Sequence, residues 1–240
     1  GRPGFAGALR RDLPLGRALG AVKEDALFLA GRHADRLGRK WPRRHPRPRV
    51  PAIIVQGELD STVPAYPPDD LHYILLELAK NSLKAVTERY SLEEEEGFEP
   101  PAVHMHIIDT PENEDIVIKV YDRGGGIPRR RAGGLFRFLV SGSPEEVQEQ
   151  FLTTLGSDLQ QSFTSSSPLA GLGVGLPLAR ARARAWGGDV QLASVHGEET
   201  TAYVYLSKEG NGDYITGDDS YYLINGPEEE ILHNKKFGVC

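Results

Sequence analysis

The stretch at residues 71–89 constrains the fold more than any other part of the chain. Counted at about 100° per residue, its apolar and small side chains fall on one stripe, which predicts a helix with one face in a core. That stripe consists of Leu71, Ile74, Leu75, Leu78, Ser82, Ala85 and Val86. A second stripe, about a quarter turn away, holds Glu77, Asn81 and Lys84 at the edge of the buried face.

These three polar side chains carry groups that are useful in phosphoryl chemistry. The Glu77 carboxylate can polarise a hydroxyl or a water, the Asn81 amide oxygen can ligate Mg²⁺, and the Lys84 ammonium can meet phosphate. The alternative is the solvated face of an ordinary helix. The helix therefore indicates a site only in combination with other motifs.

A glycine turn provides the second motif. Residues 116–120 are predicted as a strand, and Asp122, Gly124, Gly125 and Gly126 follow it directly. A carboxylate at a strand end can accept a hydrogen bond from an exocyclic amine such as that of adenine, and glycines let a backbone approach a ligand closely. The alternative is a Gly-rich turn between a strand and a helix.

Gly171, Gly173 and Gly175 form the third motif, just before a helix predicted at residues 177–185. Backbone N–H groups at the start of a helix favour phosphate. The spacing is not that of a Rossmann fingerprint, and no Gly-Lys-Ser/Thr follows as in a P-loop. Taken alone, the motif is also consistent with a flexible hinge.

The order of the three motifs resembles that of the GHKL ATPases, which share the Bergerat fold. Within them, LLELAKNSLKAVTERY, VYDRGGGIP and SPLAGLGVGLPLARARARAWGGDVQL resemble the pyruvate dehydrogenase kinase family more closely than bacterial histidine kinases. The resemblance covers roughly residues 50 to 206. It implies an α+β two-layer sandwich, with a mixed sheet packed on helices and a long ATP lid.

The resemblance also implies roles for single residues. Glu77 would be the general base toward a substrate serine, Asn81 the Mg²⁺ ligand, and Lys84 a basic residue facing the nucleotide. Asp122 would bind adenine, with Thr200 nearby. The glycine-containing segments around the nucleotide would be represented by Gly124, Gly126, Gly171, Gly173, Gly175 and Leu176.

A kinase of this family transfers the γ-phosphoryl group of ATP to the E1α subunit of a mitochondrial 2-ketoacid dehydrogenase complex and inactivates it. The resemblance therefore implies ATP and Mg²⁺ as cofactors, the mitochondrial matrix as location, and a homodimer. The lipoyl domain of the E2 core would be a further partner. These motifs do not distinguish pyruvate dehydrogenase from the branched-chain enzyme as the substrate.

The sequence departs from the family pattern at several points. Tyr73 stands where the family has a histidine, with His72 beside it, and Glu199 replaces a glycine before the family's threonine. Residues 145–163 lengthen the lid. A C-terminal Asp-Trp pair is missing, since the only tryptophans are Trp41 and Trp186.

The remaining chain suggests three parts. Residues 1–49 are interpreted as an N-terminal segment left from a helical regulatory domain and its linker, with an irregular start at 1–16 and a helix at 18–40. Residues 50–208 form the ATP-binding kinase domain, and 209–240 an acidic tail. Further strands are predicted at 53–55, 103–108, 190–194 and 201–206, and a helix at 135–139.

Composition excludes several classes of function. The formal charge is −6 and no uniform basic surface is evident, which argues against nucleic acid. No apolar run approaches the roughly 20 residues of a membrane span. The single cysteine, Cys240, fits a reducing compartment. His104 and His106 alternate on one strand face, but no third metal ligand is spaced nearby.

Two other functions remain open. A histidine kinase catalytic domain would share the pocket and need a phosphoacceptor, for which His33 on the 18–40 helix is the candidate. A nucleotide-binding regulatory module without catalysis would bind ATP and transfer nothing. Both differ from a serine kinase in the product they form.

Overall fold

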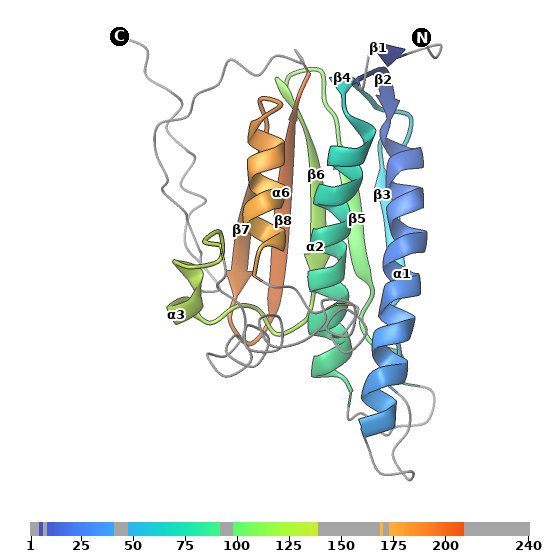
Figure 1. Ribbon diagram of the computed structural model, residues 1–240, viewed down its shortest axis with the longest axis vertical. Coiled ribbons are helices and arrows are strands. Elements are labelled where there is room, and N and C mark those ends of the chain that lie inside the picture. Colours follow the sequence, from blue (N-terminus) through green and yellow to red (C-terminus); the bar gives the residue numbers. More distant parts are fainter. Residues whose placement is uncertain are drawn as a thin grey trace, which may run out of the picture.

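The computed structural model describes residues 5–6, 9–40, 48–91, 98–138, 169 and 173–208. Three long helices lie on one face of a five-stranded sheet, as Figure 1 shows. The helices are α1 (Leu15–Lys40), α2 (Pro68–Arg89) and α6 (Gly175–Arg184). This two-layer α+β architecture confirms the predicted fold class.

The sheet has the order β3-β5-β6-β8-β7. Its strands are β3 (Ile53–Gly57), β5 (Val103–Ile108), β6 (Asp115–Asp122), β7 (Asp189–Val195) and β8 (Glu199–Ser207). β3 and β5 pair in parallel, whereas the pairs β5-β6, β6-β8 and β7-β8 are antiparallel. The sheet is therefore mixed, as expected.

Strict alternation along β6 sets the position of its last residue. Ile116, Ile118 and Val120 point into the core, with exposed fractions of 0 to 1%. Asp122 continues this row, because side chains of a strand alternate between the two faces. The strand therefore places a carboxylate on the helix-covered side of the sheet.

Helix α2 lies across the middle of the sheet, between α1 and α6 (Figure 1). It begins at Pro68, which is favourable at the first helical position because proline lacks the N–H that would be unpaired there. Asp69 and Asp70 fall in its first turn, where negative charge suits the helix dipole. The sequence placed the start at Leu71 with the two aspartates before it, so the helix is longer than predicted.

The N-terminal segment is more regular than the sequence suggested. β2 (Leu9–Pro14) pairs with β1 (Phe5–Ala6) and with β4 (Thr62–Tyr66) in a second, three-stranded sheet, so the irregular start expected for residues 1–16 is wrong over these strands. Helix α1 then packs against α2 and β3. Its inward residues belong to the same core as the main sheet: Leu15, Leu19, Val22, Ala26 and Ala30.

The region after the glycine turn also differs from the prediction. The short helix α3 spans Arg129–Ala132, and residues 133–138 form turns where a helix at 135–139 was expected. Gly133 and Gly134 end α3 early, because glycine disfavours a continuing helix. The predicted lid insertion at 145–163 and the acidic tail at 209–240 lie outside the described residues.

Candidate nucleotide site

Asp122 is the buried centre of the candidate site. Its side chain is 3% exposed and accepts hydrogen bonds from the Ser82 hydroxyl at 2.7 Å and from the Gly124 N–H at 2.9 Å. A carboxylate has about four acceptor positions, so both oxygens retain capacity for a further donor. The sequence assigned Ser82 to the core stripe and missed its bond to Asp122.

Burial has an electrostatic consequence for Asp122. Removal from water raises the pKa of its carboxyl group above the ordinary 3.8, and the hydrogen bonds from Ser82 and Gly124 oppose this only in part. A buried carboxylate that accepts hydrogen bonds from two neutral donors is stabilised further by each additional donor. The exocyclic amine of adenine is such a donor.

Thr200 lies directly opposite Asp122 in the β6-β8 register. Its hydroxyl oxygen is 2.9 Å from the Ser194 hydroxyl oxygen, and the Ser194 hydroxyl also accepts the N–H of Ile127 at 2.8 Å. The two strand ends and the end of the glycine turn are thereby joined. Sequence reasoning named Thr200 through the family resemblance and missed Ser194.

Glu77 lies one to two turns before Ser82 on α2. Its carboxylate is 14% exposed, and the Lys80 ammonium lies 2.6 Å from its Oε1 atom. A Cβ added to Gly175 would overlap Oε2 of the same carboxylate. A larger first residue of α6 would therefore have to move the Glu77 carboxylate, and the third glycine motif meets Glu77 directly.

The row on α2 continues from Glu77 through Asn81 to Ala85, one turn apart each. A Cβ added to Gly124 would overlap Ala85, so the glycine turn packs against the far end of this row. Asn81 is exposed and lies between the two contacts. Lys84 is 36% exposed, with its ammonium 3.9 Å from Glu88 Oε1.

The other predicted glycine positions have different local roles. Gly126 has φ of +65°, and a Cβ there would overlap the carbonyl of Val195 on β7. Gly173 has φ of +70°, a left-handed conformation that favours glycine. Leu176 is partly buried against the core. Gly171 lies outside the described residues.

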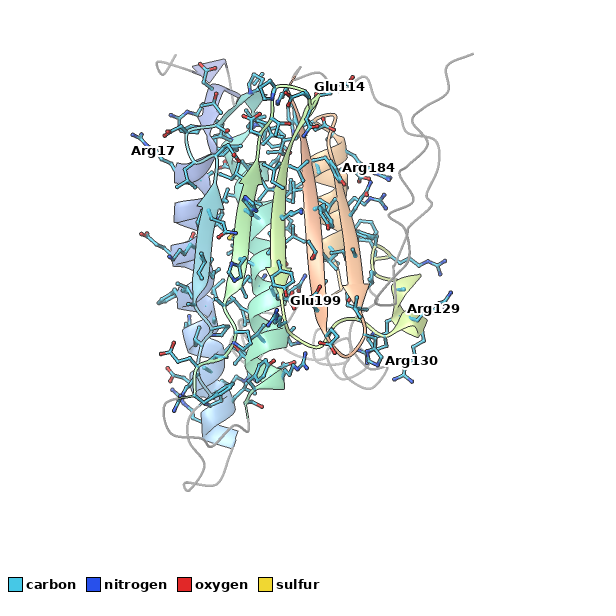
Figure 2. All side chains as sticks on the ribbon, turned by 180° about the vertical axis from the view of Figure 1, so that it is seen from behind. Arg17, Glu114, Arg129, Arg130, Arg184 and Glu199 are labelled. Atoms are coloured by element: carbon cyan, nitrogen blue, oxygen red, sulfur yellow. The ribbon has the colours of Figure 1, made fainter. Side chains whose placement is uncertain are left out.

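The replacement of a glycine by Glu199 is accommodated on the outer face of the sheet. Glu199 Oε2 accepts the Tyr121 hydroxyl at 2.6 Å, and Arg123 Nε donates to the same hydroxyl at 2.8 Å. Asp122 and Thr200 lie on the opposite face by alternation and remain paired in the β6-β8 register. Seen from behind, Glu199 lies on the face away from the helices (Figure 2).

The positions around the family's histidine make other contacts. The ring of Tyr73 lies under the Arg182 guanidinium, 4.2 Å from the ring centre to Cζ. Burial, and after it the charge of Glu77, raise the pKa of Tyr73. His72 instead reaches Asp25 on α1, with Nε2 and Oδ2 3.1 Å apart.

Two expectations about other sites can be compared with the described residues. There, no three His, Cys, Asp or Glu side chains gather as a metal cluster, and His104 instead lies beside Tyr121 with ring centres 6.0 Å apart. No helix in the described part of the chain is long and apolar enough to cross a membrane.

Comparison with known proteins places the site in a family. Residues 67–210 match the family described as histidine kinase-, DNA gyrase B-, and HSP90-like ATPase. The chain belongs to this ATPase family. An ATPase domain implies ATP as the ligand, and the match covers all three motifs around Asp122, Glu77 and Gly175.

Similar proteins include mitochondrial pyruvate dehydrogenase (acetyl-transferring) kinases. That of Arabidopsis thaliana is 38% identical over 163 residues, covering 68% of this chain and 41% of the relative. Those of Drosophila melanogaster and, as isozyme 3, Homo sapiens are 36% and 38% identical over 141 residues, covering 59% of this chain and 30% of each relative. The chain thus spans less than half the length of these relatives. The resemblance predicted from the motifs is confirmed.

Proposed function

We propose that this chain carries the ATP site of a protein serine kinase that phosphorylates the E1α subunit of a mitochondrial 2-ketoacid dehydrogenase complex. The favoured complex is pyruvate dehydrogenase. The observation that carries this proposal is the row on α2. Glu77 meets the lid glycine Gly175 at one end, Ala85 meets the turn glycine Gly124 at the other, and Asn81 lies between them. Three motifs far apart in sequence therefore surround one stretch of helix.

The residues along this row fit ATP with Mg²⁺. At one end, the buried Asp122 carboxylate accepts the adenine amine beside Thr200. In the middle, the exposed Asn81 offers an amide oxygen, a ligand that suits Mg²⁺. Lys84, one turn further on the same face, contributes positive charge for the phosphates. When bound, the metal neutralises phosphate charge.

We assign Glu77 the role of general base. Lys80 holds one carboxylate oxygen, and the other faces the start of α6. In the proposed reaction the Oε2 side of Glu77 takes the proton of a substrate serine hydroxyl. The serine oxygen forms its bond to the γ-phosphorus as the bond to the β,γ-bridging oxygen breaks, and ADP leaves.

The cellular setting follows from the similar proteins. They are named mitochondrial, and we place the chain in the mitochondrial matrix. A homodimer and contact with the lipoyl domain of the E2 core complete the proposal. The N-terminal part at 1–49 then represents the end of a regulatory segment, and 209–240 a tail.

The histidine kinase alternative is disfavoured by the position of His33. Its side chain is 3% exposed on α1, and its Nε2 lies 3.7 Å from Glu88 Oε1 on α2. A phosphoacceptor has to reach the γ-phosphorus of a bound nucleotide, and a buried histidine packed under another helix cannot. The non-catalytic module remains as an outcome of the experiment below.

The test compares phosphate transfer with nucleotide binding in the same variants. With purified pyruvate dehydrogenase E1 as substrate, Glu77→Gln is expected to lower acid-stable phosphorylation of serine by about 10²- to 10⁴-fold, the usual contribution of a general base. Calorimetry is expected to give an unchanged affinity for Mg-ATP. Asn81→Ala is expected to abolish Mg-ATP binding. Glu112→Gln, in an exposed turn, is the matched control.

Three outcomes would contradict the proposal. Unaltered Mg-ATP affinity in Asn81→Ala removes the metal site from α2. Acid-labile phosphate on the wild-type chain indicates a histidine kinase. Nucleotide binding by the wild type without transfer to either branched-chain or pyruvate dehydrogenase E1 indicates a regulatory module.

A further inference from the structure

Arg89, the last residue of α2, joins the helix to two turns at the edge of the nucleotide site. Its Nη1 atom donates to the carbonyl of Arg123 at 3.2 Å and to the carbonyl of Glu198 at 2.9 Å. Both acceptors are far away in sequence. We call these two bonds the Arg89 clamp.

The acceptors of the clamp flank the residues proposed for adenine. Arg123 directly follows Asp122, and Glu198 comes two residues before Thr200. The Glu198 carbonyl accepts from the Gly125 N–H as well, at 3.1 Å, and the Gly125 carbonyl accepts from the Gly197 N–H at 2.8 Å. The clamp thus draws the glycine turn and the β7-β8 turn onto α2 together.

The arginine stem also covers the glycine turn. A Cβ on Gly125 would lie 3.6 Å from the Cδ and Nη1 atoms of Arg89, which is van der Waals contact. Gly125 itself has φ of +95°. Turns built from glycine have many accessible conformations, so an outside contact is needed to select one.

The clamp connects the two ends of the proposed ligand. Asn81 and Arg89 belong to the same rigid helix, whereas Asp122 and Thr200 belong to strand ends that the clamp holds against it. The Ser82 hydroxyl already ties Asp122 to α2, and Arg89 adds the hold on Arg123 and Glu198, which flank Asp122 and Thr200. We propose that Arg89 is a positioning residue for adenine recognition, which deepens the proposed function and rests on it.

If Arg89 had a purely structural role, its loss would lower the stability of the whole protein. The core holds α2 in place through the Ser82–Asp122 bond and the Ala85–Gly124 contact, and Arg89 is exposed. Loss of Arg89 should therefore leave global stability almost unchanged and loosen the two turns. The loosened turns should mainly weaken the binding of the adenine part of the ligand.

The experiment measures selectivity between ATP and inosine triphosphate, which carries a carbonyl in place of the 6-amino group. In Arg89→Gln, the affinity for ATP by calorimetry is expected to fall about tenfold, or about 1.4 kcal/mol. The affinity for inosine triphosphate should change little, so the selectivity ratio falls by nearly the same factor. Arg89→Lys, which keeps one donor for a carbonyl, should recover part of the ratio.

A matched control and an independent readout make the test specific. Arg130→Gln removes an exposed arginine that points away from the sheet on α3 (Figure 2), and it should leave the ratio unchanged. Hydrogen exchange of the Gly125 amide, measured without nucleotide, should accelerate in Arg89→Gln while the melting temperature stays within about 2 °C.

The outcomes separate this inference from the proposed function. If Asp122→Ala abolishes selectivity but Arg89→Gln keeps it, the adenine site stands and the clamp has no positioning role. If Arg89→Gln weakens both nucleotides equally, the inference is also overturned. If Asp122→Ala, which removes the acceptor, keeps full selectivity, adenine does not bind at Asp122 and the proposed site itself is wrong.

Discussion

Asp122 combines two demands that oppose each other. Burial raises the pKa of its carboxyl group, which disfavours the charged form, yet the proposed recognition of the adenine amine needs a carboxylate that accepts a hydrogen bond. The Ser82 hydroxyl and the Gly124 N–H supply the donors that keep a charged group tolerable inside the protein. Ser82 thus belongs to the proposed site together with Asp122, although it would not contact the nucleotide.

Replacement of Ser82 tests this balance. Ser82→Ala is expected to lower the free energy of unfolding by about 1–3 kcal/mol at neutral pH, because a buried acceptor loses its donor. The pKa of Asp122 is higher in the folded than in the unfolded protein. Between these two pKa values the folded protein binds more protons, so the contribution of Asp122 to the free energy of unfolding falls as the pH rises from 3.8. The variant raises the folded pKa further, and its defect should shrink in acid.

Urea unfolding at neutral pH and close to pH 3.8 measures this difference. Ser91→Ala provides the control, because the Ser91 hydroxyl bonds only to the exposed Glu88 carbonyl of its own turn among the contacts of the structure. A defect of Ser82→Ala that is independent of pH would show that the hydroxyl contributes packing and no stabilisation of the Asp122 charge.

At the scale of elements, α2 organises the site by facing several neighbours at once. Its buried residues contact the sheet, and the same helix meets α6 at Gly175, the glycine turn at Gly124 and α1 along its length. Helix packing at such short range leaves no room for a side chain on the facing glycine. Glycine therefore has a packing role at Gly175 that can be separated from helix propensity.

Gly175→Ala is expected to reduce phosphate transfer at least about tenfold without loss of stability. The new methyl group would overlap Glu77 Oε2, so either the Glu77 carboxylate or the start of α6 has to shift, and a displacement of about 1 Å of the proposed general base is costly. Because Gly175 is the first residue of α6 and not an interior one, the change in helix propensity is small.

Gly20→Ala on α1 is the matched substitution, because a Cβ there has no atom within 4 Å. It should stabilise the protein by about 0.4–1 kcal/mol and leave transfer unchanged. Phosphate-transfer assays and thermal unfolding of both variants provide the measurement. Equal activity of Gly175→Ala and wild type would mean that the contact between Glu77 and α6 has no catalytic relevance.

The elements of the main sheet could be predicted from the sequence because their hydrophobic periods are local. β2 and β4 were missed for the opposite reason: Pro14 and Pro64 weaken a strand pattern, and the two strands pair with each other across a long stretch of the chain. The same reason applies at the site. Ser82 and Arg89 bond to groups at least 34 residues away, whereas Lys80, three residues from Glu77, could have been found from helical spacing.

At the scale of the molecule, α1 and the ATP-binding sheet share one hydrophobic core. Leu15 and Leu19 are completely buried in the cluster that also contains Leu75 and Ile118. The interpretation of residues 1–49 as a separate N-terminal part stays a prediction. For stability, the shared core implies that α1 and the sheet unfold together.

Leu19→Ala tests whether α1 is part of the same cooperative unit. The substitution is expected to cost about 2–5 kcal/mol, as is usual for a buried leucine, and to shift the transitions seen by circular dichroism and by tryptophan fluorescence equally. Phe28→Ala removes a larger side chain that is 66% exposed on the same helix and should change stability by about 0.5 kcal/mol or less. Two separate transitions in Leu19→Ala would show that α1 unfolds on its own.

The contacts of Asp70 have a mechanical consequence for the whole molecule. Arg182 and Trp186, at the far end of α6, donate to its two carboxylate oxygens at 2.7 and 2.9 Å, which fastens that end to the first turn of α2. A ten-residue helix is about 15 Å long, so a tilt of about 4° around the fastened end moves its other end by about 1 Å. Any change of tilt about Asp70 would therefore be largest at Gly175, the residue that meets the proposed general base Glu77.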